Sequence, residues 1–268
     1  MSHSSSPFEG NTKVLSAPRC VIAGIDLTGS AATDYLRQHQ SEQSQDIVIF
    51  YNNIKNLILL DTVDLLILLA NYTVESLEKV SILAQECQKK QPHITIVAVI
   101  YNDETSFNLS NNLPFKQIDN VAVIFANSST TQSSSETIVD VVTLLTNPLF
   151  GLGFVGIDWA DIVAFFANGG TGFFGIGKST STQVASETAC QSVMANVNRF
   201  SLSHNHNKRP LNTWFLVHSH DVNLSELQTV NDVCLWITTD LGTPNIQIMD
   251  MMDTEIRGVE VSVLVKYD

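Results

Sequence analysis

The sequence predicts an α/β protein of two domains, with a parallel sheet in the first and an α+β arrangement on a mixed sheet in the second. In the first half, apolar runs that suit buried strands alternate with segments of helical periodicity, which is the pattern of a parallel sheet covered on both faces. Beyond residue 148 the order of elements changes. Hydrophobic residues make up 44% of the 268 residues, enough for each domain to bury a core.

The predicted elements of the first half follow a polar tail at residues 1–17, whose serine-rich composition is typical of a flexible terminus. The predicted strands cover residues 20–25, 46–51, 65–70, 93–101 and 121–126. After a turn at residues 26–30, the first predicted helix runs to residue 40, and the others cover residues 74–90 and 137–146. The Asn147-Pro148 step ends the last helix, so we place the first domain at residues 18–148.

The second domain, residues 149–268, has a different pattern. Its predicted helices cover residues 159–167, 182–197 and 225–239. Its predicted strands cover residues 171–177, 213–219, 245–250 and 258–265. Because the last two strands follow each other without a helix between them, we expect helices packed on a mixed sheet.

Composition and charge exclude two classes of partner. The net charge is −13 and the densest basic run is Lys208-Arg209, whereas binding to a phosphate backbone needs clustered Lys and Arg. The longest apolar run, residues 63–70, is too short to span a bilayer and contains Asp64. The four cysteines are far apart, which suits reduced thiols, and the polar amino terminus has no apolar signal core. We expect a cytoplasmic protein that binds no nucleic acid and has no membrane span.

The turn after the first predicted strand has the position of a phosphate-binding turn. Gly24 and Gly29 would let the backbone approach a phosphate, and Ser30 would cap the helix that follows. Against this interpretation, Asp26 places a carboxylate where a phosphate would lie. We favour a plain connection between strand and helix, since every α/β domain has such a turn.

Residues 172–179 read Gly-Phe-Phe-Gly-Ile-Gly-Lys-Ser and match the phosphate-binding pattern G-x-x-x-x-G-K-[ST] in full. That loop needs a buried strand before its first glycine and a helix directly after its lysine. Here the preceding residues 161–167 have a helical pattern, and residues 172–177 alternate small and large side chains as a strand does. We therefore predict a glycine-rich strand at this position.

Two pairs of side chains are further candidates for a site. His218 and His220 are two residues apart in and after a predicted strand, so they could face one side and ligate a metal ion. No Cys or Glu stands at ligand spacing beside them, and partly exposed loop histidines are the simpler interpretation. Asp158 and Asp161 stand at the predicted start of a helix. They either cap that helix or polarise water on the nucleotide of a partner.

An ordered set of motifs follows residue 148. Gly156-Ile-Asp-Trp-Ala-Asp-Ile162 is similar to an N-x-D-F-A-D stretch, with glycine in place of the Asn, and a glycine-rich run follows at residues 168–177. Further matches come in order at residues 185–189, 215–231, 245–248 and 259–265. Together these motifs resemble the carboxy-terminal domain of the FtsZ/tubulin superfamily over about residues 149–268.

The first half is similar to that family in outline only, as a reduced, Rossmann-like domain of nucleotide-binding type. Residues 20–36 fit the family's first strand, phosphate turn and helix, and residues 65–69 fit the strand before its G-G-G-T-G-[TS]-G loop. At the position of that loop, residues 70–76 contain no glycine. Without glycine the backbone cannot reach positive φ or approach phosphates closely. We therefore expect no cofactor, although the resemblance by itself implies GTP.

Our leading hypothesis is a degenerate FtsZ-like subunit of a cytoskeletal filament, as in cell division, that does not hydrolyse GTP itself. The resemblance implies that the loop bearing Asp158 and Asp161 enters the nucleotide pocket of the next subunit, where the carboxylates act on the partner's nucleotide. The chain would join or regulate a filament of its own copies, or of an FtsZ/tubulin-like protein, through this loop. On this hypothesis it is not an independent enzyme.

Two alternatives stay open. The first is a divergent, polymer-forming GTPase that holds GTP through Gly24, Thr28, Gly29 and Ser30. The second is a metal- or small-molecule-binding α/β enzyme built around His218 and His220. Nucleotide titration separates the leading hypothesis from the first alternative, and metal analysis tests the second.

Overall fold

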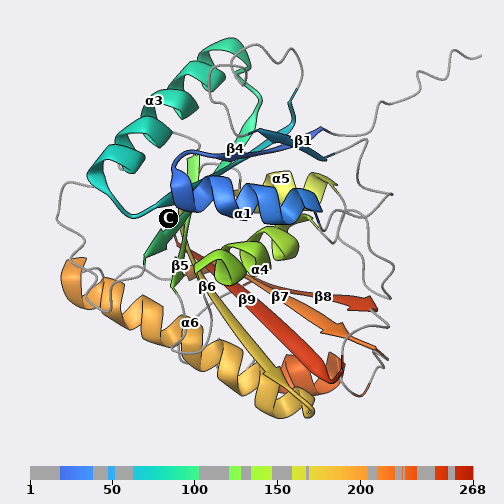
Figure 1. The fold of residues 1–268 in the computed structure, drawn as a ribbon. Helices are drawn as coiled ribbons and strands as arrows, with labels where there is room; N and C mark the ends of the chain where they lie inside the picture. Colours follow the sequence, from blue (N-terminus) through green and yellow to red (C-terminus); the bar gives the residue numbers. More distant parts are fainter. Residues whose placement is uncertain are drawn as a thin grey trace, which may run out of the picture.

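The computed structural model describes parts of both predicted domains (Figure 1). The described residues are 19–38, 48–51, 63–102, 121–127, 134–146, 159–166, 169–204, 210–220, 225, 227–233, 245–252 and 257–267. The predicted tail at residues 1–17 and the candidate Asp158 lie outside them. Helices and strands occur in both halves, which confirms the predicted α/β class.

The described strands form one nine-stranded sheet in the order β2-β1-β3-β4-β5-β6-β9-β7-β8. Their bounds are β1 Cys20–Gly24, β2 Val48–Tyr51, β3 Leu65–Asn71, β4 Thr95–Asn102, β5 Val121–Asn127, β6 Gly170–Ser179, β7 Pro210–Ser219, β8 Asn245–Met252 and β9 Val259–Tyr267. Neighbours from β2 to β6 are parallel, β9 is antiparallel to both β6 and β7, and β7 is parallel to β8. The strands of the first half are thus parallel and those of the second half mixed, as predicted.

Helices cover both faces of this sheet. They are α1 Leu27–Gln38, α3 Val74–Lys90, α4 Ser134–Thr146, α5 Trp159–Phe166 and α6 Thr182–His204, and residues 227–233 are also helical. Side chains of α3 and α6 share a core with Leu66 and Leu68 of β3, whereas those of α1, α4 and α5 share a second core with Leu65 and Ile67. Alternate residues of β3 therefore point to opposite faces. No helix among the described residues is long and apolar enough to cross a membrane.

Several helix boundaries differ from the prediction, among them the start of α4, which is Ser134 instead of residue 137. α1 begins at Leu27, so the turn expected at residues 26–30 is shorter and most of it belongs to the helix. α6 continues to His204 instead of ending at residue 197, and residues 198–204 contain neither Gly nor Pro to stop it. By contrast, the bounds of α3 are those predicted.

The glycine-rich residues 172–179 lie within β6, which confirms the strand prediction. α6 packs directly against this strand. A Cβ atom on Gly175 would lie 2.5 Å from the carbonyl oxygen of Ala189, and one on Gly177 would lie 2.0 Å from that of Ala185. Both glycines therefore serve the close packing of a helix on a strand.

Lys178, the lysine of the phosphate-binding pattern, is half-exposed and makes ion pairs with two other elements of the chain. Its Nζ lies 2.7 Å from a carboxylate oxygen of Glu260 in β9 and 3.7 Å from one of Asp140 in α4. Burial lowers the pKa of Lys178, but the hydrogen bond to Glu260 and the nearby carboxylates outweigh burial and raise it. The lysine thus links α4 to the second half of the sheet. Because β5 also pairs with β6, hydrogen bonding crosses the predicted boundary at residue 148, and the division into two domains stays a prediction.

Candidate functional site

Two helices of the first half begin at the same edge of the sheet. β1 ends at Gly24 and β3 at Asn71, and α1 and α3 begin soon afterwards, at Leu27 and Val74. Because β1 and β3 are parallel neighbours, with Gly24 opposite Leu69, the two helix starts lie at one edge. Ligands of open α/β sheets bind outside this carboxyl edge. It is therefore the candidate site.

Gly24 and Gly29 bring α1 into direct contact with the sheet. A Cβ atom on Gly24 would lie 2.5 Å from the backbone nitrogen of Ser30, and one on Gly29 would lie 2.0 Å from the carbonyl oxygen of Leu69. Both distances are far below van der Waals contact, so a side chain at either position would push the helix off the strands. Close packing of α1 accounts for both glycines without a ligand.

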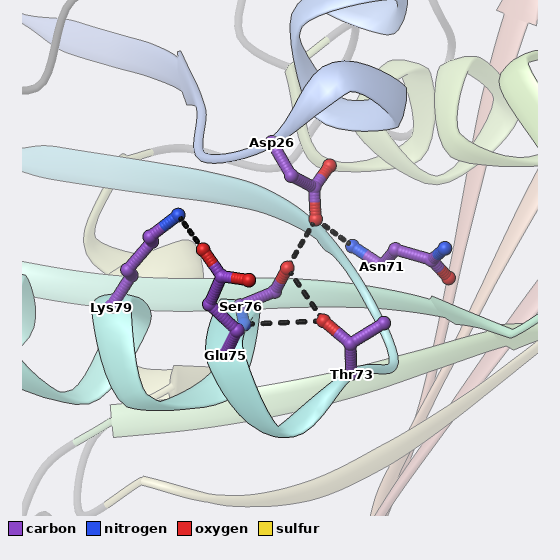
Figure 2. Close-up of polar contacts among 6 residues, drawn as sticks. All are labelled: Asp26, Asn71, Thr73, Glu75, Ser76 and Lys79. Atoms are coloured by element: carbon purple, nitrogen blue, oxygen red, sulfur yellow. Dashed lines mark hydrogen bonds and ion pairs between the residues drawn. The ribbon is translucent and has the colours of Figure 1, made fainter.

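Asp26 caps α1 and also reaches the start of α3. Its Oδ1 accepts a hydrogen bond from the backbone N–H of Gly29 at 2.9 Å, as a helix N-cap does. Its Oδ2 accepts hydrogen bonds from the backbone N–H of Asn71 and from the hydroxyl of Ser76, both at 2.7 Å. Figure 2 shows the carboxylate between the first turn of α1 and the start of α3. One side chain thus joins two elements that are far apart in the sequence.

Thr73 orients the serine that contacts Asp26. Thr73 is the N-cap of α3, and its Oγ1 accepts a hydrogen bond from the backbone N–H of Ser76 at 3.2 Å. The Thr73 hydroxyl donates to Oγ of Ser76 at 2.9 Å, and the Ser76 hydroxyl donates to Asp26. Ser76 is only 5% exposed, so this chain of hydrogen bonds is largely shielded from solvent on the α3 side.

The Asp26 carboxylate lies where two helix dipoles favour a negative charge. Helix N-termini carry partial positive charge and unpaired N–H groups, and for this reason they often hold phosphate groups. Here the chain supplies the anion itself, and its three hydrogen-bond donors are Gly29, Asn71 and Ser76. A phosphate at these donors would be repelled by the negative charge of the Asp26 carboxylate.

The structure brings the four predicted cofactor-binding residues to one junction of strand and helix: Gly24, Thr28, Gly29 and Ser30. Thr28 and Ser30 are half-buried in the first turn of α1. The prediction that Ser30 caps this helix is wrong, because the Ser30 N–H donates to the backbone carbonyl oxygen of Asp26 at 2.8 Å and so belongs to the helix. Asp26 is the cap. Nucleotide binding by the four residues stays a prediction.

Sequence reasoning missed Asn71 and Ser76 as members of this site. A threonine directly before the helical pattern of residues 74–90 indicates an N-cap, whose bond reaches the residue three positions on, Ser76. That signal was available. The contact of Ser76 with Asp26 spans 50 residues and depends on the pairing of β1 with β3, which no local pattern specifies.

The other candidate carboxylates belong to α5 and the segment before it. Asp161 lies half-buried in the first turn of α5, and Asp158 lies outside the described residues. The spacing predicted for this pair at the helix start is therefore untested. Asp161 does not join the Asp26 site, because Figure 1 shows α5 away from the edge where α1 and α3 begin.

Several contacts fix the carboxy-terminal end of α5. The rings of Phe165 and Trp214 lie 3.9 Å apart between centroids, and Nζ of the buried Lys266 donates to the carbonyl oxygen of Phe165 at 2.6 Å. A Cβ atom on Gly169, just after α5, would lie 2.7 Å from the carbonyl oxygen of Val121, the first residue of β5. α5 therefore ends at the amino edge of the parallel strands, opposite the Asp26 site.

The structure does not place the two histidines on one strand face. His218 is buried in β7, whereas His220 lies beyond Ser219, the last residue of that strand, and is exposed. In the described part of the chain, no group of three or more His, Cys, Asp or Glu side chains could hold a metal ion.

Solved structures of FtsZ and CetZ proteins have a similar fold. A mutant FtsZ from M. jannaschii aligns with a TM-score of 0.67 at 14% identity, over 94% of this chain and 91% of that one. CetZ1 from Haloferax volcanii, a GDP-bound monomer, gives a TM-score of 0.56 at 12% identity, over 93% of both chains. CetZ2 from Haloferax volcanii, a GTPγS-bound protofilament, gives 0.56 at 10% identity, also over 93% of both. No family model matches the sequence, and a search of curated proteins finds no match.

The chain therefore has the fold of FtsZ and CetZ. FtsZ and CetZ share it with this chain over nearly its whole length. The structure confirms the resemblance that the motifs after residue 148 indicated, and it extends the likeness to the first half, where the sequence matched in outline only.

Proposed function

We propose that this chain is an assembly subunit of a tubulin-like cytoskeletal filament that holds no GTP of its own. The observation that carries the proposal is the Asp26 carboxylate, which takes three hydrogen bonds at the edge where the sheet would hold phosphates. The subunit joins or regulates the filament through the start of α5 and the residues before it, and it is not an independent GTPase.

The charge of Asp26 opposes a phosphate at this edge. Two unit charges 4 Å apart interact by about 4 kcal/mol at an effective dielectric constant of ~20, the value suited to pairs near a protein surface. A phosphate would also have to take the donors that Asp26 occupies, and Gly24 and Gly29 are already packed against backbone atoms. These effects add to the absence of glycine in residues 70–76.

The proposed contact with a partner is made by the start of α5 and the residues before it. α5 carries Asp161 in its first turn, and Asp158 precedes it in the sequence. The partner is another copy of this chain or an FtsZ/tubulin-like protein, and the two carboxylates act on the partner's nucleotide where it has one. CetZ2 from Haloferax volcanii, which shares the fold, was solved as a protofilament, and this supports assembly of the present chain.

Thermal unfolding with GTP and Mg²⁺ tests the first part of the proposal. A ligand at 100 times its Kd stabilises the native state by about 2.7 kcal/mol, which moves the melting temperature by several degrees. We expect no saturating shift for the wild type up to millimolar GTP. A saturating shift would contradict the proposal and favour the GTPase alternative.

Co-sedimentation with polymerising FtsZ tests the second part. We expect the wild type to bind or shorten FtsZ filaments, and Asp158→Ala combined with Asp161→Ala to weaken this effect and any added phosphate release. Asp232→Ala is the matched control, because this exposed carboxylate lies on the helical residues 227–233, outside α5. If Asp232→Ala weakens binding to FtsZ as much as the double substitution does, the contact is not made by Asp158 and Asp161.

The second candidate function is a nucleotide-binding polymer former. The observation that favours it is that CetZ1 and CetZ2, which share the fold, were solved with GDP and GTPγS. On this alternative, Gly24, Thr28, Gly29 and Ser30 would hold the nucleotide and Asp26 would have to leave its three donors. It predicts a saturating thermal shift that Asp26→Ala increases.

A further inference from the structure

The outer side of α6 carries a row of uncharged side chains. Helical spacing of four, three and four residues places four exposed side chains in this row, which we call the α6 ridge: Val184, Thr188, Gln191 and Ala195. The buried side chains on the other side of the helix belong to the core that α6 shares with the sheet, among them Ala185, Ala189 and Val193. Figure 1 shows α6 on the outside of the second half of the sheet. The α6 ridge therefore faces away from the fold.

α6 carries little charge, although the chain has a net charge of −13. Among its described side chains, residues 182–197, Glu187 is the only charged one, and it accepts a hydrogen bond from the side-chain amide of Gln183 at 2.9 Å. By contrast α3, whose side chains share the same core, exposes six charged side chains: Glu75, Glu78, Lys79, Glu86, Lys89 and Lys90. Depletion of charge distinguishes the centre of a protein interface from the rest of a surface. The α6 ridge thus has the character of an interface.

The α6 ridge is complementary to itself when a second copy lies antiparallel to it. Its spacing is the same in both directions, so an antiparallel copy can place Val184 opposite Ala195, which joins two apolar side chains. The same register places Thr188 opposite Gln191. The Thr188 hydroxyl donates to the carbonyl oxygen of Val184 at 2.7 Å, which leaves lone pairs of its oxygen for the amide of Gln191 in the other copy. Each contact then occurs twice, as a two-fold interface requires.

Electrostatics favour a second copy in this orientation. Two chains of like net charge repel each other least where the contact itself holds no charge. Antiparallel helices also bring the positive N-terminal end of one α6 beside the negative C-terminal end of the other. A basic partner, which the net charge would attract, would find no carboxylate on the α6 ridge to pair with. The ridge spans 11 residues, about 16 Å, so one helix pair buries less than a standard interface and the contact is weak.

We propose that the α6 ridge is a two-fold contact between two copies of this chain, with their α6 helices antiparallel. The inference goes beyond the proposed function and does not depend on it, because it uses neither α5 nor the Asp26 edge. The contact joins the same face of both copies, so it closes after two copies. Its expected product is a dimer that forms without nucleotide.

Sedimentation velocity of the full chain over a range of concentrations tests this contact at low salt. We expect a reversible monomer–dimer equilibrium for the wild type, unchanged by GTP. Thr188→Lys with Gln191→Lys should weaken dimerisation about tenfold or more, because each lysine would face a lysine of the other copy. The matched control is Ile82→Lys with Gln85→Lys, which places two lysines at the same spacing on the exposed side of α3 and should leave dimerisation unchanged.

Two further variants test the symmetry and the register. Thr188→Glu with Gln191→Glu should also be monomeric, whereas its mixture with the double-lysine variant should form a 1:1 dimer that added salt weakens. Thr188→Lys with Gln191→Glu in one chain should dimerise by itself, because only antiparallel helices place each lysine opposite a glutamate.

Four outcomes would overturn the inference. They are a wild type that is monomeric at every concentration, an equal loss in the α3 control, no dimer in the mixture, and no dimer of the Lys–Glu variant. Oligomers that keep growing with concentration and that the α6 substitutions leave unchanged would also overturn it. That last result would support the proposed function, since assembly through α5 does not use the α6 ridge.

Discussion

Replacing Asp26 with alanine is the most direct test of the site. The carboxylate holds the N-terminus of α1 through Gly29, the end of β3 through Asn71 and the start of α3 through Ser76, at 2.9, 2.7 and 2.7 Å. Asp26→Ala removes all three bonds and leaves two backbone N–H groups and one hydroxyl without this acceptor. The variant should fold, because the cores on both faces of the sheet are untouched.

The expected loss of stability follows from these contacts. Loss of an N-cap costs about 1 kcal/mol, and hydrogen bonds to a charged group contribute roughly 1.5–3 kcal/mol each when well formed. The site is half-buried, so water will replace part of what the two further bonds contribute. We expect Asp26→Ala to lower the free energy of unfolding by about 2–4 kcal/mol. Asp26→Asn, which keeps an acceptor for Gly29 but loses the charge, should fall about halfway.

Urea unfolding followed by circular dichroism measures this difference as a shift of the midpoint at constant slope. Asp34→Ala is the matched control, because Asp34 is on the same helix and pairs with Arg37 at 3.0 Å in a largely exposed ion pair. That substitution should cost no more than about 1 kcal/mol. Equal losses for the two alanine variants, or a loss below about 0.5 kcal/mol for Asp26→Ala, would refute the idea that the carboxylate holds this edge together.

Four further substitutions, one of them a control, test other parts of the fold. Gly177→Val should destabilise by about 3 kcal/mol or more, since its Cβ would meet backbone of α6 at 2.0 Å. Gly172→Ala should cost clearly less in the same urea assay, because its Cβ would come closest to side-chain atoms, at 3.2 Å. Lys178→Ala should cost at most about 1 kcal/mol and leave any nucleotide response unchanged, because the half-exposed lysine pairs within the fold. The pKa of Lys178 is raised in the folded state. The difference in the free energy of unfolding between Lys178→Ala and the wild type should therefore be fully present at neutral pH and disappear as the pH rises past 10.5. Lys266→Met should lower the free energy of unfolding by about 1–3 kcal/mol, seen as a lower melting temperature, because the carbonyl oxygen of Phe165 loses its buried donor. No measurable change would show that water replaces that donor.

Local patterns in the sequence predicted most of the elements but not the order of the strands. α3 was predicted at its observed bounds because apolar residues follow the helical period and Pro92 stops it. The buried strands were found because each is a short apolar run. The place of β9 between β6 and β7 depends on antiparallel contacts of residues 80 or more apart for β6, and no local propensity encodes them.

For the site, too, local patterns indicated single residues but not the contacts between distant ones. Asp26 stood out as a carboxylate in the position of a phosphate, and the structure shows it accepting hydrogen bonds there. Ser30 was assigned as the cap because serine is a good cap residue, yet Asp26 is as good and stands nearer to the end of β1. The structure assigns the cap to Asp26, because α1 begins at Leu27 and the N–H of Gly29 donates to Oδ1 of Asp26.

A side chain differs from a nucleotide as a link between α1 and α3. In nucleotide switches, segments are ordered by contacts to a phosphate and released when that phosphate is hydrolysed or leaves. Asp26 is part of the chain and cannot leave, so its bonds to Asn71 and Ser76 are available in every folded molecule. On the proposed function, this edge has one state, and GTP gives no free energy to alternate between two. Assembly would then depend on the concentrations of the chain and of its partner. In a filament that contains this subunit, GTP hydrolysis could not weaken the contact at its Asp26 edge.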